Sequence, residues 1–397
     1  MFEIKEQGQY YLILSLVALQ SFVDLGIIPV MSNVILRDWT EYKNTVSDHL
    51  QSNKISKIRG YFYFFLKWYS ILSFILLFIS VIFSLNFRED SQLFNLLISI
   101  SFIVVLNFFL NLFWLFLEGI GDFYNLYLFR TIQLLFSTGC LFFFITCDFG
   151  IHSLLFFYSS LFFSSVIFIF FKWRTFKFLI FGERIIFQYF KEIFPFHFNV
   201  FIQSLFGYFT WQALIPLFYD KTGALFSGKL GVTLQIAALF LSFSTFLVYS
   251  KSPIYSKLLF SKSHHDVLNI WKKDLITSYL IFIFLILIYL FLFYMDVSLF
   301  RPFFNRSLNV TNSFLIFIIH FFYVFNHSIS VLSRLNKKEL LTVSGVFVPI
   351  LSYAIVYFCI DLFSLDIIFV MLLFLNSLFF IYNYLKFKKF KSDFKSI

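Results

Sequence analysis

Residues 279–293 read YLIFIFLILIYLFLF, an apolar run without a single charged side chain. Extended to 274–295, the segment reaches the length of about 20 residues that a helix needs to cross a hydrocarbon core roughly 30 Å thick. Because lipid offers no partner to backbone N–H and C=O groups, the run is predicted to be a helix, which bonds its own backbone. Almost nothing in it is polar beyond Thr277 and Ser278, so we expect a peripheral helix.

The same pattern recurs along the chain, and the composition excludes a soluble protein. Hydrophobic residues make up 60% of the 397 positions and charged residues 13%, whereas a soluble domain carries about 25% charged residues. The sequence therefore predicts an all-α polytopic membrane protein, a two-lobe helical bundle with about 11 transmembrane helices. The predicted spans lie near 9–36, 60–86, 92–117, 121–146, 150–172, 193–219, 229–252, 274–295, 311–333, 339–360 and 364–386.

Basic residues in the connections predict the orientation. Lys and Arg concentrate in alternate connections, with 23 in one set and 4 in the other. Since basic loops stay on the cytoplasmic side, we expect a cytoplasmic C-terminus and Met1 outside. The excess basic residues behind the net charge of +10 then lie at one membrane face, where anionic lipid attracts them. We therefore expect membrane lipids as partners and no nucleic acid. The richer set falls in 37–59, 172–191, 251–273, 334–338 and 386–395.

No metal, cofactor or catalytic constellation is predicted. Cys140, Cys147 and Cys359 have no metal-ligand spacing, and their odd number argues against a disulfide framework. The longest predicted outer loop, 296–310, is short for a catalytic loop. We therefore expect a protein that is not an enzyme.

The chain repeats itself at coarse resolution. Gly8 opens a long helix that contains Gln20, and about 220 residues later Gly228 opens another that contains Gln235. Parallel repeats of six helices are a recurrent transporter plan, with the substrate site between the halves. The predicted domains are an N-terminal lobe over 1–172 with five visible helices, an amphipathic inter-lobe linker over 173–191, a C-terminal lobe over 192–386 with six helices, and a basic cytoplasmic tail over 387–397.

The N-terminal lobe has five predicted helices and the C-terminal lobe has six, which suggests a twelve-helix plan that lacks the first helix. The predicted outward N-terminus agrees, because a twelve-span chain would start inside. We hypothesise either a start codon further upstream or a truncated gene. An upstream reading frame without an additional apolar span would contradict the first version. The linker 173–191 is the expected hinge between the lobes.

Short motifs distributed over nearly the whole chain resemble a known family. They are Glu6-Gln7-Gly8-Gln9-Tyr10 with Asp24-Leu25-Gly26, Glu118-Gly119-Ile120-Gly121 with Arg130, and Gln212 to Tyr219 with Thr222-Gly223 and Ser227-Gly228. In this order they resemble Wzx-type O-antigen and capsular polysaccharide flippases of the multidrug/oligosaccharidyl-lipid/polysaccharide exporter superfamily.

The resemblance implies a twelve-helix, two-lobe fold in the bacterial inner membrane with a central cavity. It also implies flipping of undecaprenyl-diphosphate-linked oligosaccharide repeat units for surface polysaccharide biosynthesis by alternating access. Its partners would include that lipid-linked oligosaccharide, a polysaccharide polymerase and other export machinery. The absent first helix departs from the family and puts the activity of the chain in doubt.

Polar stripes on predicted helices supply the candidate site residues. His320, Tyr323, His327, Ser330 and Arg334 follow spacings of three and four, which places them on one helical face. We expect this face to line the cavity, with interhelical hydrogen bonding as the alternative. The two histidines are two turns apart, too far for one ion, so no metal site is predicted.

Arg130, Gln133 and Ser137 form a second stripe. A rise of about 1.5 Å per residue puts Arg130 roughly 13 Å inside its helix, and we favour it as the leading diphosphate contact. The alternative is a structural ion pair with Asp24 or Glu118, which are also the coupling-ion candidates. Further cavity candidates are Asn111, Gln203 and Gln235.

Three other interpretations remain open. A MATE-like multidrug/cation antiporter would have the same architecture, although Arg130 and the histidines favour an anion over a drug cation. A membrane-embedded sugar polymerase or ligase would need a longer outer loop. The third is a truncated, non-functional paralogue.

Overall fold

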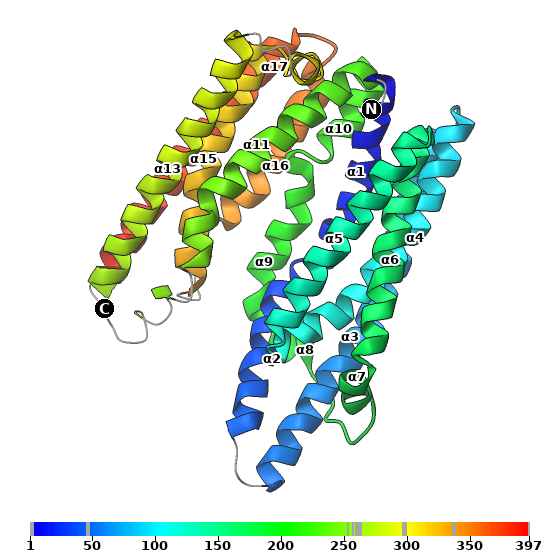
Figure 1. Ribbon diagram of the computed structural model, residues 1–397. Coiled ribbons are helices and arrows are strands. Elements are labelled where there is room, and N and C mark those ends of the chain that lie inside the picture. Colours follow the sequence, from blue (N-terminus) through cyan, green and yellow to red (C-terminus); the bar gives the residue numbers. More distant parts are fainter. Residues whose placement is uncertain are drawn as a thin grey trace. The chain divides into compact units, whose positions relative to one another are not determined.

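The computed structural model describes residues 4–44, 48–251, 254–255, 258, 264–295, 300–335 and 339–395. Within these ranges the regular elements are helices, and ten are long and apolar enough to cross a membrane. An all-α polytopic membrane protein is therefore confirmed (Figure 1). The predictions that concern Lys257, Lys262, Lys337 and Lys338 lie outside the described residues.

The first predicted span, 9–36, is the point at which the helix count differs. It folds as two helices, α1 (Ile4–Asp24) and α2 (Ile27–Asn44), and neither is among the ten. Leu25 and Gly26 separate them with φ values of 56° and 69°, in the left-handed region that an α-helix does not use. The ten candidate helices of the described residues compare with about 11 predicted, and the difference is this first segment, which the backbone break divides.

Residues 4–205 belong to the first of two compact units. Its long helices are α3 (Asp48–Leu85), α4 (Ser91–Gly119), α5 (Phe123–Thr146) and α6 (Ser153–Phe171), the last preceded by the 3₁₀ turn η1 (Gly150–His152). Helix α4 packs against α1, α2, α3 and α6, whereas α5 packs mainly along α6. The core of this unit therefore centres on α4.

The predicted linker 173–191 is helical at its two ends and non-helical between them. Helix α7 (Trp173–Ile180) gives way to a non-helical segment before the short α8 (Tyr189–Glu192) and α9 (Phe194–Gly207). Three hydrogen bonds hold the end of α7 and the segment after it along α3: Arg59 Nε donates to the Phe178 carbonyl over 3.1 Å, Tyr63 Oη to the Ile180 carbonyl over 2.8 Å, and the Ile185 amide to the Ser56 carbonyl over 3.0 Å. The segment is thus part of the first unit.

The second compact unit begins at Phe206, so most of α9 groups with the first unit. Helix α15 (Val310–Leu335) packs against α11 (Ala224–Ser250), α13 (His264–Tyr294) and α17 (Leu365–Lys395). Helix α13 exposes many large side chains, including Phe284 and Phe291, as expected for a peripheral helix. The remaining elements are η2 (Tyr208–Thr210), α10 (Leu214–Thr222), α14 (Arg301–Phe304) and α16 (Thr342–Cys359).

Helix α17 continues through most of the segment predicted as a basic tail. Phe387 and Phe390 are buried in a cluster with Trp271 of α13 and Phe325 of α15. The lysines between them are exposed. The alternation of Lys and Phe in this segment therefore follows a helix with one buried face.

Candidate functional site

Asp24 ends α1 at the backbone break and lies half-buried inside the first unit. Its carboxylate accepts a hydrogen bond from the Tyr69 hydroxyl of α3 over 2.7 Å, and another from the backbone N–H of Ile28 in the first turn of α2. Helix N-termini carry unpaired N–H groups and a partial positive charge. The carboxylate is therefore held by a hydroxyl and a helix terminus. Among the residues that the structure describes, it forms no ion pair.

Arg130 on α5 lies over the ring of Trp114 on α4, with its guanidinium carbon 4.2 Å from the ring centroid. Trp114 is buried and stacks on Phe129 and Phe168. The guanidinium forms no ion pair within the described ranges, although Glu118 is close enough to influence it electrostatically. The expected alternative, an ion pair of Arg130 with Asp24 or Glu118, is therefore not formed in this structure.

Gln133 differs from Arg130, although the two were predicted as one stripe. Gln133 is buried, and its amide nitrogen donates to the Leu161 carbonyl and to Ser165 Oγ, each over 2.7 Å. These bonds join α5 to α6. Arg130 is exposed, so the stripe contains one interhelical contact and one exposed cation.

The predicted face of α15 meets three other elements of the second unit. Buried His320 donates from Nδ1 to the Ile316 carbonyl over 2.9 Å and stacks on Trp211 with ring centroids 5.6 Å apart. Tyr323 Oη donates to Asn376 Oδ1 of α17 over 3.0 Å. The ring nitrogen Nδ1 of His327 lies 2.8 Å from Tyr249 Oη of α11.

Two residues of this face, Tyr323 and His327, thus form hydrogen bonds between helices, as the alternative interpretation of the face expected. Arg334, at its end, pairs through Nε with Glu339 Oε2 over 2.8 Å. Trp211 and Asn376 were missed in the sequence. Asn376 could have been found, because an amide in an otherwise apolar span has to be bonded inside the protein. Trp211 gave no such signal.

The other candidates are distributed over both units. Asn111 of α4 and Gln203 of α9 are half-buried in the first unit, and Gln235 of α11 is exposed in the second. Their predicted roles in a cavity stay predictions. No group of three or more His, Cys, Asp or Glu side chains in the described part of the chain could hold a metal ion.

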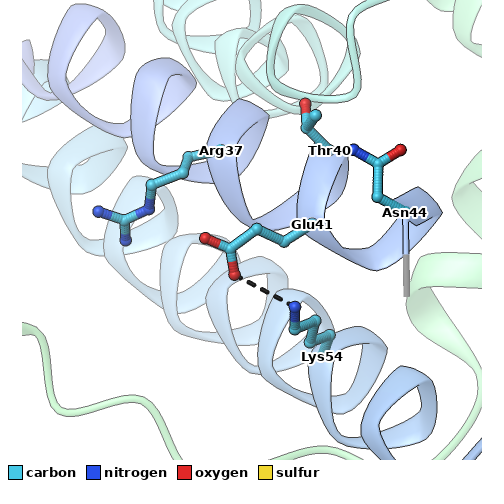
Figure 2. Close-up of a pocket in the computed structure, with 5 residues that line it drawn as sticks. All are labelled: Arg37, Thr40, Glu41, Asn44 and Lys54. Atoms are coloured by element: carbon cyan, nitrogen blue, oxygen red, sulfur yellow. Dashed lines mark ion pairs between the residues drawn. The ribbon is translucent and has the colours of Figure 1, made fainter. Parts of the chain in front are cut away.

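Two adjoining pockets lie near the start of α3, where no binding residue was predicted. Figure 2 shows the first, of about 430 Å³, in which Glu41 of α2 pairs with Lys54 of α3 over 3.2 Å. The second, of about 490 Å³, reaches Asp38, Lys57 and the segment 185–187. Their lining mixes both signs of charge, which indicates no single ligand class.

Asp38 beneath these pockets is almost fully buried, yet its charge is compensated. Burial alone would raise its pKa, but hydrogen bonds from Tyr61 and Lys57, with the charges of Lys57 and Arg37, hold the pKa below its ordinary value of 3.8. The second unit has a similar arrangement, in which buried Asp274 accepts from Lys251 Nζ over 2.5 Å and from Tyr255 Oη over 2.6 Å.

The arrangement of apolar helices and their buried polar contacts defines a polytopic membrane protein of two helical units. No protein-family model and no curated protein matches the sequence. Two solved structures share its fold. One is an inward-facing multidrug resistance MATE family transporter of the MOP superfamily, 14% identical with a TM-score of 0.56, covering 100% of this chain and 96% of that one.

The other is a MATE protein in the bent conformation, 12% identical with a TM-score of 0.59, covering 100% of this chain and 95% of that one. At these identities the likeness establishes the fold. The fold is that of MATE proteins.

Proposed function

We propose that the protein is a cation-coupled exporter that works by alternating access, as the MATE fold suggests. The observation that carries this proposal is Asp24, a carboxylate inside a predicted span that has no basic partner among the described residues. Ionisable side chains at membrane depth are costly and usually serve transport. Asp24 is therefore assigned the role of the coupling residue.

The surroundings of Asp24 fit reversible neutralisation. A proton or a sodium ion that binds the carboxylate would compete with the Tyr69 hydroxyl and the Ile28 N–H, which both donate to it. These two hydrogen bonds link Asp24, at the end of α1, to α3 and to α2. A change of charge at Asp24 would therefore weaken the contacts that hold the α1–α2 break. A bound cation can drive transport only if it binds the two conformations with different affinity.

The test uses purified protein in proteoliposomes with ethidium as a probe cation. We expect an imposed proton or sodium gradient to drive ethidium transport, and Asp24→Asn to abolish gradient-driven transport while ethidium binding persists. Asp266→Asn, at an exposed position of α13, is the matched control and should transport normally. Gradient-driven transport by Asp24→Asn at the wild-type rate would refute the coupling role.

A second function, flipping of undecaprenyl-diphosphate-linked oligosaccharide, is favoured by one observation. Arg130 is an exposed residue, and its guanidinium rests on Trp114 without an ion-pair partner in the described ranges, so its charge is not neutralised there by an acidic side chain. The diphosphate would be that anion, and a polysaccharide polymerase in the bacterial inner membrane would take the product. The C-terminus would be cytoplasmic.

Complementation of a flippase-deficient, polysaccharide-negative strain distinguishes the two functions. A flippase should restore surface polysaccharide, Arg130→Ala should abolish it, and Arg130→Lys should retain part of it. Full polysaccharide with Arg130→Ala at normal expression would remove Arg130 from the role. If the wild-type protein does not complement the strain but transports ethidium in vesicles, the flippase function is refuted and the exporter function is supported.

A further inference from the structure

His197 of α9 reaches the backbone break between α1 and α2. Its imidazole is 1% exposed, and Nε2 lies 2.9 Å from the Leu25 carbonyl oxygen. The other ring nitrogen, Nδ1, is bonded to the Tyr189 hydroxyl. Since a carbonyl oxygen only accepts, Nε2 carries the proton, and the neutral ring accepts from Tyr189 at Nδ1.

The Leu25 carbonyl needs such a donor. Carbonyls at the C-terminal end of a helix have no partner within the helix, and here the chain turns into the left-handed region directly after Asp24. His197 satisfies the carbonyl from a helix that is distant in sequence. The hydrogen bonding at the break therefore depends on a side chain of α9.

A second contact between α9 and the break is made one to two turns further along α9. A Cβ on Gly26 would lie 2.5 Å from Ser204 Oγ and 2.8 Å from a methyl carbon of Val200. Positions 197, 200 and 204 share one face of a helix. This face of α9 therefore covers the break at both Leu25 and Gly26.

We propose that His197 is a positioning residue for Asp24. By holding the Leu25 carbonyl, it sets the bend that directs the Asp24 carboxylate to Tyr69 and to the first turn of α2. Tyr189 orients the imidazole, because its hydroxyl bonds Nδ1 and its buried ring packs on Phe64. This inference rests on the coupling role proposed for Asp24.

The test compares His197→Leu with His197→Gln in ethidium transport by proteoliposomes. Leu has no donor for the Leu25 carbonyl, whereas the Gln amide can donate to it. We expect Leu to raise the proton or sodium concentration for half-maximal transport about five- to tenfold, the size of one lost hydrogen bond, with an unchanged KM for ethidium. Gln should stay within about twofold of wild type.

Two further variants keep the outcome decisive. Tyr189→Phe retains the imidazole but removes its orienting hydroxyl, and we expect a shift in the same direction of about threefold. It serves if His197→Leu does not fold. His265→Leu, at an exposed histidine of α13, is the control and should leave the cation dependence unchanged.

The positioning role fails if His197→Leu, or Tyr189→Phe where Leu does not fold, lowers turnover without shifting the cation dependence. It also fails if Gln shifts the dependence as much as Leu. The failure of the proposed function is recognised separately. If Asp24→Asn keeps full coupling, Asp24 is not the coupling residue, whatever the His197 variants do.

Discussion

The Tyr61 hydroxyl of α3 donates to Asp38 Oδ2 of α2 over 2.6 Å, and Lys57 Nζ lies 3.1 Å from the same oxygen. Tyr61 and Lys57 are one helical turn apart, so α3 presents both donors to one buried carboxylate. This contact ties the two helices on either side of the first basic connection. In the second unit, Tyr255 and Lys251 do the same for Asp274.

The lowered pKa of Asp38 predicts how stability changes with pH. A carboxyl whose pKa is lower in the folded protein contributes stability above its ordinary pKa of 3.8, and loses it as the pH falls through the folded value. At pH 7 we expect Asp38→Asn to unfold at a lower temperature than wild type. The difference should shrink below about pH 4.

Thermal unfolding in detergent between pH 7 and pH 3 measures this difference. Asp366→Asn, at an exposed position in the first turn of α17, is a control that should differ less from wild type, because only the helix terminus stabilises this carboxylate. A constant difference between Asp38→Asn and wild type over the whole pH range would contradict the prediction.

Gly26→Ala is expected to destabilise the first unit. The new Cβ would meet Ser204 Oγ at 2.5 Å, and φ of +69° is strained for a residue with a side chain. Together we expect a loss of about 1–3 kcal/mol. Adding Ser204→Gly should recover part of the steric cost, because the Val200 methyl still lies 2.8 Å from the new Cβ, while Gly139→Ala, which meets nothing within 4 Å, should not destabilise the protein. Thermal unfolding that is unaffected by Gly26→Ala would show that the break can relax.

Phe387→Ala should destabilise the second unit because its ring is 6% exposed and packs on Trp271. Large-to-small changes of buried aromatic residues cost about 3–5 kcal/mol. Lys388→Ala, at an exposed neighbour, should cost little. Equal effects of the two variants on thermal unfolding would contradict the packing role of Phe387.

The segment after α7 is expected to lie in the membrane interface. Ile186 and Phe181 are 86% and 62% exposed although they lie outside the ten candidate spans. Arg174, Lys177 and Arg184 surround them in sequence, a combination typical of interfacial anchors on anionic lipid. A fluorophore on Ile186→Cys in a cysteine-free background should be quenched by lipid nitroxides and shielded from iodide in phosphatidylglycerol nanodiscs. Ready quenching by iodide would contradict this placement.

The class of fold was predictable because a segment that crosses a membrane must be apolar and must hydrogen-bond its own backbone N–H and C=O groups. Run lengths such as 274–295 identified nearly all the spans. The break at Leu25 was not predictable, because Asp24-Leu25-Gly26 occurs inside an apolar run and one glycine does not by itself end a helix. It depends on α9 fitting against Gly26, which is a tertiary contact.

The candidate site was less accessible to sequence reasoning. The spacing of His320, Tyr323 and His327 predicted one polar face of a helix, but spacing does not reveal partners. Those partners, Trp211, Asn376 and Tyr249, lie on other elements. The same limit applies to His197, whose partner is 172 residues away.

The close contact between α9 and Gly26 also restricts how this sequence can drift. The chain contains 68 phenylalanines, so substitution toward large apolar residues is readily accepted on its lipid-facing surfaces. Val200 and Ser204 face a backbone that leaves no room even for an added methyl group. At these two positions side-chain volume is set by geometry, and substitution by phenylalanine would be opposed by selection.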